Sequence, residues 1–233
     1  MRRLTVCLAV VALVMAFGAS SAVAAGGDVK KFCKANLALD KQFAADEPDL
    51  DRVNELLDTL AETAPPEIAD AVNLAVPAFK ENPETAFEDP AVADAVAQVE
   101  QFEYEGCGYE QIPVTFEDYA FDGLPGEIDK GRVAFELTNV GAEAHEIVFF
   151  RLKGDATLDD LLEADEAEFE DLASEVGGGF ALPGETGYTS AVFKKKGDYA
   201  ALCFIPVGTT SEETEGTGPP HFEEGMAAEF EVT

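Results

Sequence analysis

Two histidines, a cysteine and a methionine in the second half of the chain have the types and the order of a metal-ligand set. His145 comes first, Cys203 second, and His221 and Met226 follow five positions apart. The chain has only these two histidines. Two imidazoles, a thiolate and a weak axial thioether form blue-copper electron-transfer sites, because sulfur ligands suit Cu(I) and imidazoles suit copper as well. We therefore interpret these four residues as candidate copper ligands.

Each of the four residues also has an ordinary structural explanation. A histidine at the start of a strand is commonly a satisfied polar group, and a lone Cys or Met is commonly core. The metal interpretation rests on the four together and in order. It leaves three functions open: a single-electron carrier, a module that sequesters or delivers copper, and an interaction domain without metal. We do not expect an enzyme, because two histidines cannot build the oxygen-reducing cluster of a multicopper oxidase.

The elements that must position these residues are strands. After residue 108 the apolar residues alternate with a period of two, and Gly, Pro, Asn and Asp separate the segments. This pattern predicts an antiparallel β-sandwich. A helical pattern over 157–176 interrupts it. The expected strands are 112–121, 131–140, 145–152, 188–193, 197–204 and 227–233.

The segments that carry the candidate ligands resemble those of the cupredoxins, the plastocyanin- and azurin-like blue copper proteins. "ELTNVGAEAHEIVFF" is similar to their strand, turn and first-histidine segment, and "GDYAALCFIP" to the strand that delivers the cysteine. His221 with Gly225 and Met226 resembles the end of the plastocyanin-type ligand loop. The resemblance covers about residues 110–233. It implies a Greek-key sandwich, one copper ion, a redox partner protein, and a second histidine near the surface as the electron exit.

Two features depart from the cupredoxin pattern. The family has few residues between the cysteine and the second histidine, whereas this chain has the long segment 204–220. Pro219 and Pro220 should stiffen its return to His221. Family members often carry Asn directly after the first histidine, where it ties two ligand loops together, and this chain has Glu146.

The first half of the chain reads as a bundle of three or four helices. Segments 28–46, 49–64, 66–82 and 90–105 carry apolar residues at spacings of three and four. Asp49 is a plausible N-cap, Pro90 fits a first helical turn, and Pro77 should end or kink the third helix. We expect these apolar stripes to form a core with no polar cluster pointing inward. The predicted fold class is α+β in two modules, the bundle preceding the sandwich.

Cysteine usage points to an oxidising compartment. Cys33 and Cys107 lie at the two ends of the helical segment, where a bundle can bring them together, and we predict a disulfide between them. Closing so long a loop contributes about 4–5 kcal/mol in the chain-entropy model. Cys203 is then left for the metal.

The first 24 residues read as a secretory signal peptide. Two arginines precede a short apolar run that ends in small residues at Ala24. Later stretches are not apolar enough to span a bilayer. The predicted organisation is a signal peptide at 1–24, a helical module at 25–107 and a copper-binding domain at 108–233, in an extracytoplasmic protein with no membrane insertion after cleavage.

The charge of the chain limits its partners. With 47 Asp and Glu against 15 Lys and Arg, the formal net charge is −32. Nucleic acid and anionic membranes carry the same sign, so neither is an expected partner. The acidic residues form either a solvated surface suited to salt or a rim that steers a cationic redox partner. Five of them belong to the segment that closes the candidate metal site: Glu212, Glu213, Glu215, Glu223 and Glu224.

Overall fold

The computed structural model describes residues 27–43, 48–83, 85–211 and 213–233. The predicted leader, residues 1–24, and Cys7 lie outside this part of the chain. Within it, no helix is long and apolar enough to cross a membrane.

Helices occupy the first half, as the periodicity predicts: α1 (Val29–Phe43), α2 (Leu50–Thr63), α3 (Ala69–Glu81), the 3₁₀ turn η1 (Ala86–Glu88) and α4 (Pro90–Gly106). Asp49 caps α2 by accepting a hydrogen bond from the Arg52 backbone N–H, and Pro90 opens α4. Of the two outcomes expected for Pro77, an end of the third helix is excluded because α3 continues to Glu81, and a kink stays a prediction. The proline removes one hydrogen bond, and burial of the face carrying Val72 and Val76 outweighs that loss.

The predicted disulfide is confirmed. Cys33 in α1 and Cys107 at the end of α4 are bonded, with Cα atoms 5.7 Å apart. The bond closes the bundle at the point where the chain enters the first strand. Among the described cysteines Cys203 is free, and it is buried.

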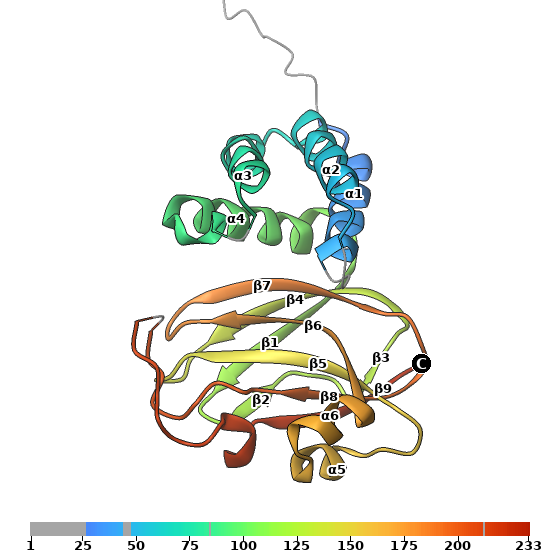
Figure 1. Ribbon diagram of the computed structural model, residues 1–233, viewed down its shortest axis with the longest axis vertical. Coiled ribbons are helices and arrows are strands. Elements are labelled where there is room, and N and C mark those ends of the chain that lie inside the picture. The colour runs from blue at the N-terminus through green and yellow to red at the C-terminus, as the bar shows by residue number, and fades with distance from the viewer. Residues whose placement is uncertain (1–26, 44–47, 84, 212) are drawn as a thin grey trace, which may run out of the picture.

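The second half forms a sandwich of two sheets (Figure 1). One sheet has the order β2-β1-β4-β7 and the other β3-β9-β8-β5-β6. The strands are β1 (Glu110–Glu117), β2 (Ala120–Asp122), β3 (Glu127–Ile128), β4 (Gly131–Asn139), β5 (His145–Leu152), β6 (Ala173–Ala181), β7 (Thr186–Phe193), β8 (Gly197–Leu202) and β9 (Ala227–Val232). Their inward residues form one apolar core that includes Phe135, Phe149 and Phe193.

The sandwich is mixed rather than antiparallel. β1 pairs with β4, and β3 with β9, in parallel, while the other pairs are antiparallel. Alternation shows which face of a strand is buried but not the direction of its neighbour, so sequence pattern could not reveal this.

The helix expected over 157–176 is two short helices followed by a strand. Capping boxes at Thr157 and Asp165 start α5 (Leu158–Glu163) and α6 (Glu166–Leu172) separately. β6 then pairs with β5, so closely that a Cβ on Gly178 would lie 2.5 Å from the Ile147 carbonyl oxygen. The run of glycines that lowers strand propensity is therefore what permits this pairing.

The helical half packs against the first sheet, with α4 over β7 (Figure 1). Arg132 of β4 binds Asp40 of α1 and lies 3.8 Å from Glu103 of α4. Glu103 is only 5% exposed. The expectation that no polar cluster points inward is therefore wrong, because the junction of helices and sheet buries charged groups. The exact ranges of the two modules remain a prediction.

Candidate metal centre

Strand ends bring the four candidate ligands to one end of the sandwich. His145 is the first residue of β5, and Cys203 directly follows β8. His221 opens the 3₁₀ turn η2 (His221–Glu224), and Met226 directly precedes β9. Because β5, β8 and β9 are neighbours in one sheet, residues distant in sequence become adjacent here.

Three of the candidates converge on one point. The donor atoms of His145, Cys203 and His221 all lie within 4.8 Å of one another, and the three residues are 0% exposed. The two Nδ1 atoms are 3.0 Å apart, and the Cys203 Sγ atom is 3.4 Å from Nδ1 of His221. Both imidazoles therefore turn the same nitrogen toward the thiol.

Met226 is also fully buried, in the core cluster that contains Cys203. Its backbone is tied to two other candidates: its carbonyl accepts from the Cys203 N–H at 3.2 Å, and its N–H donates to the His221 carbonyl at 3.0 Å. The positive φ of 113° at Gly225 lets the chain turn sharply between His221 and Met226. Its role as an axial ligand remains a proposal.

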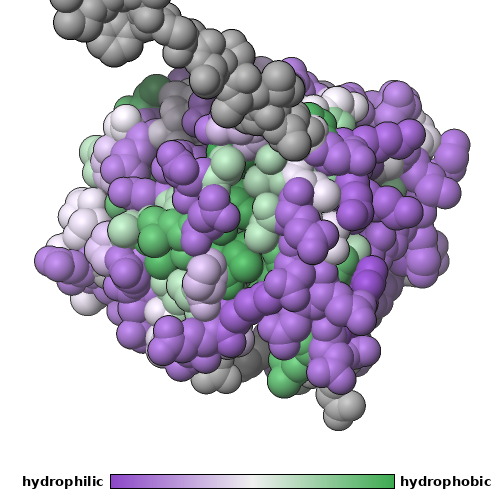
Figure 2. Space-filling view, turned by 90° about the horizontal axis from the view of Figure 1, so that it is seen from above, coloured by the Kyte–Doolittle hydropathy of each residue, from purple (hydrophilic) through white to green (hydrophobic). Residues whose placement is uncertain are grey.

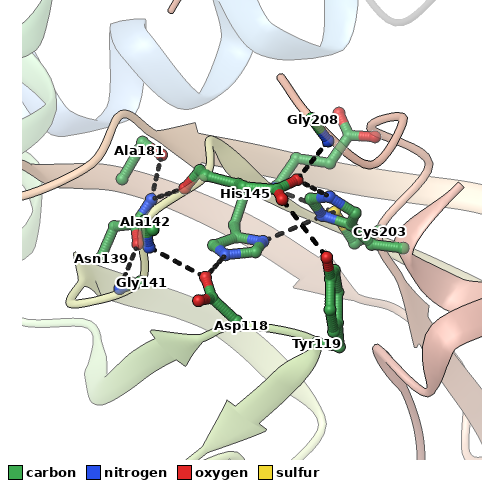
Figure 3. A network of polar contacts seen from close by, with 12 residues as sticks. Asp118, Tyr119, Asn139, Gly141, Ala142, His145, Ala181, Cys203 and Gly208 are labelled. Atoms are coloured by element: carbon green, nitrogen blue, oxygen red, sulfur yellow. Dashed lines mark hydrogen bonds and ion pairs between the residues drawn. The ribbon is translucent and has the colours of Figure 1, made fainter. Parts of the chain in front are cut away.

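Carboxylates hold the outer nitrogens of both rings (Figure 3). Nε2 of His145 lies 3.3 Å from Asp118, and Nε2 of His221 lies 3.0 Å from Glu143. Glu143 also accepts from the Tyr119 hydroxyl at 3.3 Å and from the Gly208 backbone N–H at 2.6 Å. Carboxylates in this position fix the ring orientation and tautomer of metal-binding histidines.

The second histidine is covered by neighbouring side chains rather than directly exposed. His221 is 0% exposed, and Tyr119 packs against its ring with centroids 5.1 Å apart. The side chain of Glu143, which is 18% exposed, stands between the ring nitrogen and solvent. A route to the surface from His221 therefore passes through Glu143 or Tyr119.

The turn before His145 is fixed by Asn139. Its side-chain amide donates to the carbonyls of Glu143 and Ala181, both at 2.8 Å, and its Oδ1 accepts from the Gly141 N–H. Asn139 is 1% exposed. This buried network holds the strand entry, and with it the direction of the His145 ring (Figure 3).

Glu146 links two ligand segments in place of the Asn typical of the family. Its Oε1 accepts from the Phe204 N–H at 3.0 Å, and its own N–H points to the Cys203 Sγ at 3.4 Å. A carboxylate is thus sufficient for the link that the sequence departure put in doubt. Burial raises the pKa of Glu146, with the bond from Phe204 acting in the opposite direction.

The long segment 204–220 is closed at its base. The Val207 N–H donates to the Pro219 carbonyl at 2.9 Å, and the His221 N–H donates to the Ile205 carbonyl at 2.9 Å. An antiparallel bridge joins Pro206 and Pro220. We call these contacts, which join 205–207 to 219–221, the clasp. The residues between them form a loop beyond the clasp, and His221 is held next to Cys203 as if the connection were short.

Burial shifts the pKa values of Cys203 and His145. Desolvation raises the pKa of the Cys203 thiol to about 12, with the Glu146 N–H acting to lower it. Desolvation also lowers the pKa of His145, opposed by Asp118. Neutral imidazoles and a thiol that exchanges its proton for a cation are what a metal requires. Two buried imidazoles and a buried thiol at these distances fit copper.

Sequence reasoning missed the outer residues Asp118, Tyr119 and Glu143. Asp118 and Tyr119 lie in the turn between β1 and β2, on the other sheet, and no local spacing connects them to His145 or His221. Glu143 precedes His145 by two positions, which was a usable signal, but nothing in the sequence indicated which ring it would bind.

Comparison with known proteins gives structural likenesses only. No family model and no curated protein matches the chain. An auracyanin from Roseiflexus castenholzii is 19% identical, with 54% of this chain and 99% of that chain covered and a TM-score of 0.35. Auracyanin A from Chloroflexus aurantiacus is 20% identical, with 52% and 99% covered and a TM-score of 0.32. A multicopper oxidase from Aquifex aeolicus is 15% identical, with 54% and 30% covered and a TM-score of 0.31.

These values are too low to carry an argument, so the assignment rests on the chain itself. Its sandwich has two sheets, a parallel first pair of strands, and a His-Cys-His cluster built from the ends of β5 and β8 and from the turn before β9. The second half of the chain therefore has the two-sheet sandwich and the ligand cluster that its resemblance to the cupredoxins implies.

Proposed function

We propose that this chain is a mononuclear type 1 copper protein that carries single electrons, with His145, Cys203 and His221 as strong ligands and Met226 as the weak axial one. The observation that carries the proposal is the convergence of three fully buried donors within 4.8 Å. Bound copper would supply a one-electron change between Cu(II) and Cu(I). We propose that the chain transfers electrons to a partner rather than transforming a substrate.

The protein's contribution is to hold the donors still in a site that excludes water. Asp118 and Glu143 fix the imidazoles from outside, Glu146 joins the His145 and Cys203 segments, and the clasp at Val207 fixes the return to His221. Rigid donors that suit both oxidation states keep rearrangement small during electron transfer.

A copper-delivery role is less well supported by the same geometry. A delivery protein has to release its metal to a receiving site, so at least one ligand should be accessible. Here all four candidates are 0% exposed, and both outer ring nitrogens are engaged.

The proposed setting is extracytoplasmic. The Cys33–Cys107 disulfide is of the kind that persists in oxidising compartments. The proposed partner is a redox protein with a cationic face, because Glu213, Glu215, Glu223 and Glu224 are exposed around the closing segment. Glu212 lies outside the described residues.

The experiment that separates carrier from delivery protein combines a redox titration with metal retention. The purified chain loaded with one equivalent of Cu(II) should titrate reversibly with one electron, and a Cu(I) chelator should not remove copper over the course of the titration. Rapid loss of copper to the chelator on reduction would contradict the carrier proposal and favour delivery.

A further inference from the structure

The helical half contains a cavity of about 720 Å³ between its four helices, distant in sequence from the metal ligands. Its floor includes Thr189 and Ser190 of β7. Figure 2 shows the hydrophobic side chains gathered in this hollow. Sites for small organic molecules are typically of this size and mostly apolar, with a few polar groups at fixed positions. The walls include Leu39, Val53, Leu57, Val72, Val76 and Phe79.

One side of the cavity carries a cluster of carboxyl groups. Asp40 of α1 and Glu100 and Glu103 of α4 all line it. The side chain of Glu103 is 6% exposed, and its Oε1 atom accepts no hydrogen bond. A buried polar atom without a hydrogen bond is costly, so a ligand that donates to it would be favoured.

The positive charge near this cluster does not balance it. Arg132 contributes a single positive charge. Its Nη2 atom already binds Asp40 and Ser190, and it lies 3.8 Å from Glu103. Its guanidinium also stacks on Tyr109 at 4.9 Å. Lys41, the neighbour of Asp40, adds a second positive charge, so three carboxyls share two cations.

The titration behaviour of the cluster agrees with this imbalance. Desolvation and the neighbouring charge of Glu103 raise the pKa of Glu100 to about 8. Desolvation raises the pKa of Glu103 to about 7, opposed by Arg132. A further cation in the cavity would stabilise the ionised forms of Glu100 and Glu103 and lower both pKa values.

We propose that this cavity binds a small organic cation with an apolar body, such as an alkyl amine. The ammonium would donate to Glu103 Oε1 and Glu100, and the alkyl part would contact the apolar walls. An anion would meet like charge, and a purely apolar molecule would leave Glu103 Oε1 unpaired. This binding function is separate from the proposed copper site, and either can fail without the other.

Isothermal titration calorimetry on the full chain can test the proposal with three probes of equal chain length. These are decylamine and decanoate, each below its micelle concentration, and decanol, below its solubility limit. Decylamine should bind with a 1:1 stoichiometry and at least tenfold more tightly than decanol, and decanoate should bind most weakly. Equal affinities for amine and alcohol, tighter binding of decanoate, or no amine binding would overturn the proposal.

Variants test whether the two carboxyl groups bind the positive charge of the amine. Glu100→Gln/Glu103→Gln should weaken decylamine binding at least tenfold and leave decanol binding unchanged. Glu100→Gln alone, at a less buried position, should give a smaller loss in the same direction and serves if the double variant does not fold. The matched control is Glu62→Gln/Glu67→Gln, two exposed positions of the same half, which should bind like the unmodified chain. Undiminished amine binding in both cavity variants would contradict the proposal.

Discussion

Glu143 links the proposed metal ligand His221 to neighbouring residues through hydrogen bonds. Its carboxylate binds Nε2 of the ring at 3.0 Å and is itself held by Tyr119 and Gly208. The bond between His221 Nε2 and Glu143 thus connects a buried ligand to a side chain that is partly exposed. A change at Glu143 should alter the electronic properties of the site more than its capacity to bind metal.

We predict that Glu143→Gln raises the reduction potential of the copper-loaded protein. Removing a negative charge next to the ring disfavours the more positive Cu(II) state, and a tenfold change in preference corresponds to about 59 mV for one electron. Potentiometric titration measures the shift. The control is Glu224→Gln, an exposed residue of η2, the 3₁₀ turn that carries His221, and a much smaller shift is expected for it. Equal shifts would mean that only net charge matters.

The candidate ligands were predictable because their chemistry is carried by residue type and order. His145, Cys203, His221 and Met226 could be identified without knowing how the sheets pair. Asp118 and Tyr119 could not, because they reach the site only through the packing of one sheet on the other. The role of Glu146 was also hidden, since its bond to Phe204 depends on strand pairing.

The clasped segment 204–220 shows how a long connection can hold its two ends together. Its base is held by backbone hydrogen bonds at Val207 and Ile205. Gly216 makes this approach possible, because a Cβ there would lie 2.2 Å from the Val207 carbonyl oxygen. Sequence length alone could not reveal the clasp, since it depends on contacts between the two ends of the segment.

We predict that Gly216→Ala loosens the clasp. Overpacking against a backbone oxygen should cost about 1–3 kcal/mol and speed copper loss to a chelator. Chelator competition and thermal unfolding measure the two effects. Gly126→Ala is the matched control, because a Cβ there meets nothing within 4 Å. A Gly216 variant as stable and as retentive as this control would show that the clasp does not hold His221.

Helix and strand positions were predictable where local pattern dominates and were missed where pairing dominates. The stripe of α2, with Val53, Leu56, Leu57 and Leu60 buried, was evident from its spacing. β6 was not, because its three consecutive glycines carry no alternation and acquire strand structure only through β5. The parallel pairing of β1 with β4 likewise has no local signal.

We expect the stability of the fold to depend on pH, because Glu100 and Glu103 lie in the buried region where the helices meet β7. Both have folded-state pKa values raised from 4.5, to about 8 and about 7. Between the unfolded pKa of 4.5 and these raised values, the folded state therefore binds more protons than the unfolded state. The free energy of unfolding consequently falls as pH rises through that window.

We predict that the free energy of unfolding falls by roughly 1–3 kcal/mol between pH 5 and pH 8. Urea unfolding at several pH values measures it. In Glu100→Gln/Glu103→Gln the slope should flatten, while in the exposed pair variant Glu62→Gln/Glu67→Gln it should persist. A slope retained in the junction variant would assign the pH dependence to other carboxyls.

The net charge of −32 acts on partners at longer range. If the exposed carboxylates around the proposed site steer a cationic partner, Glu213→Gln/Glu215→Gln/Glu223→Gln should slow electron transfer to a basic redox protein, mainly at low salt, because screening sets in beyond about 8–10 Å at physiological ionic strength. Stopped-flow rates across ionic strengths test this. The control neutralises three exposed residues of the helical half, Glu62, Glu67 and Asp70. Equal slowing would contradict local steering.

The proposed copper site is tested most directly by the visible absorption spectrum of the purified chain with one equivalent of Cu(II). An intense thiolate-to-copper band should appear and saturate at one copper per chain. It should be absent in Cys203→Ser, because a hydroxyl cannot supply that charge transfer, and retained in Met226→Leu with a raised potential, because the axial donor tunes the site. An intense band that persists in Cys203→Ser, or no band in the unmodified chain, would contradict the assignment.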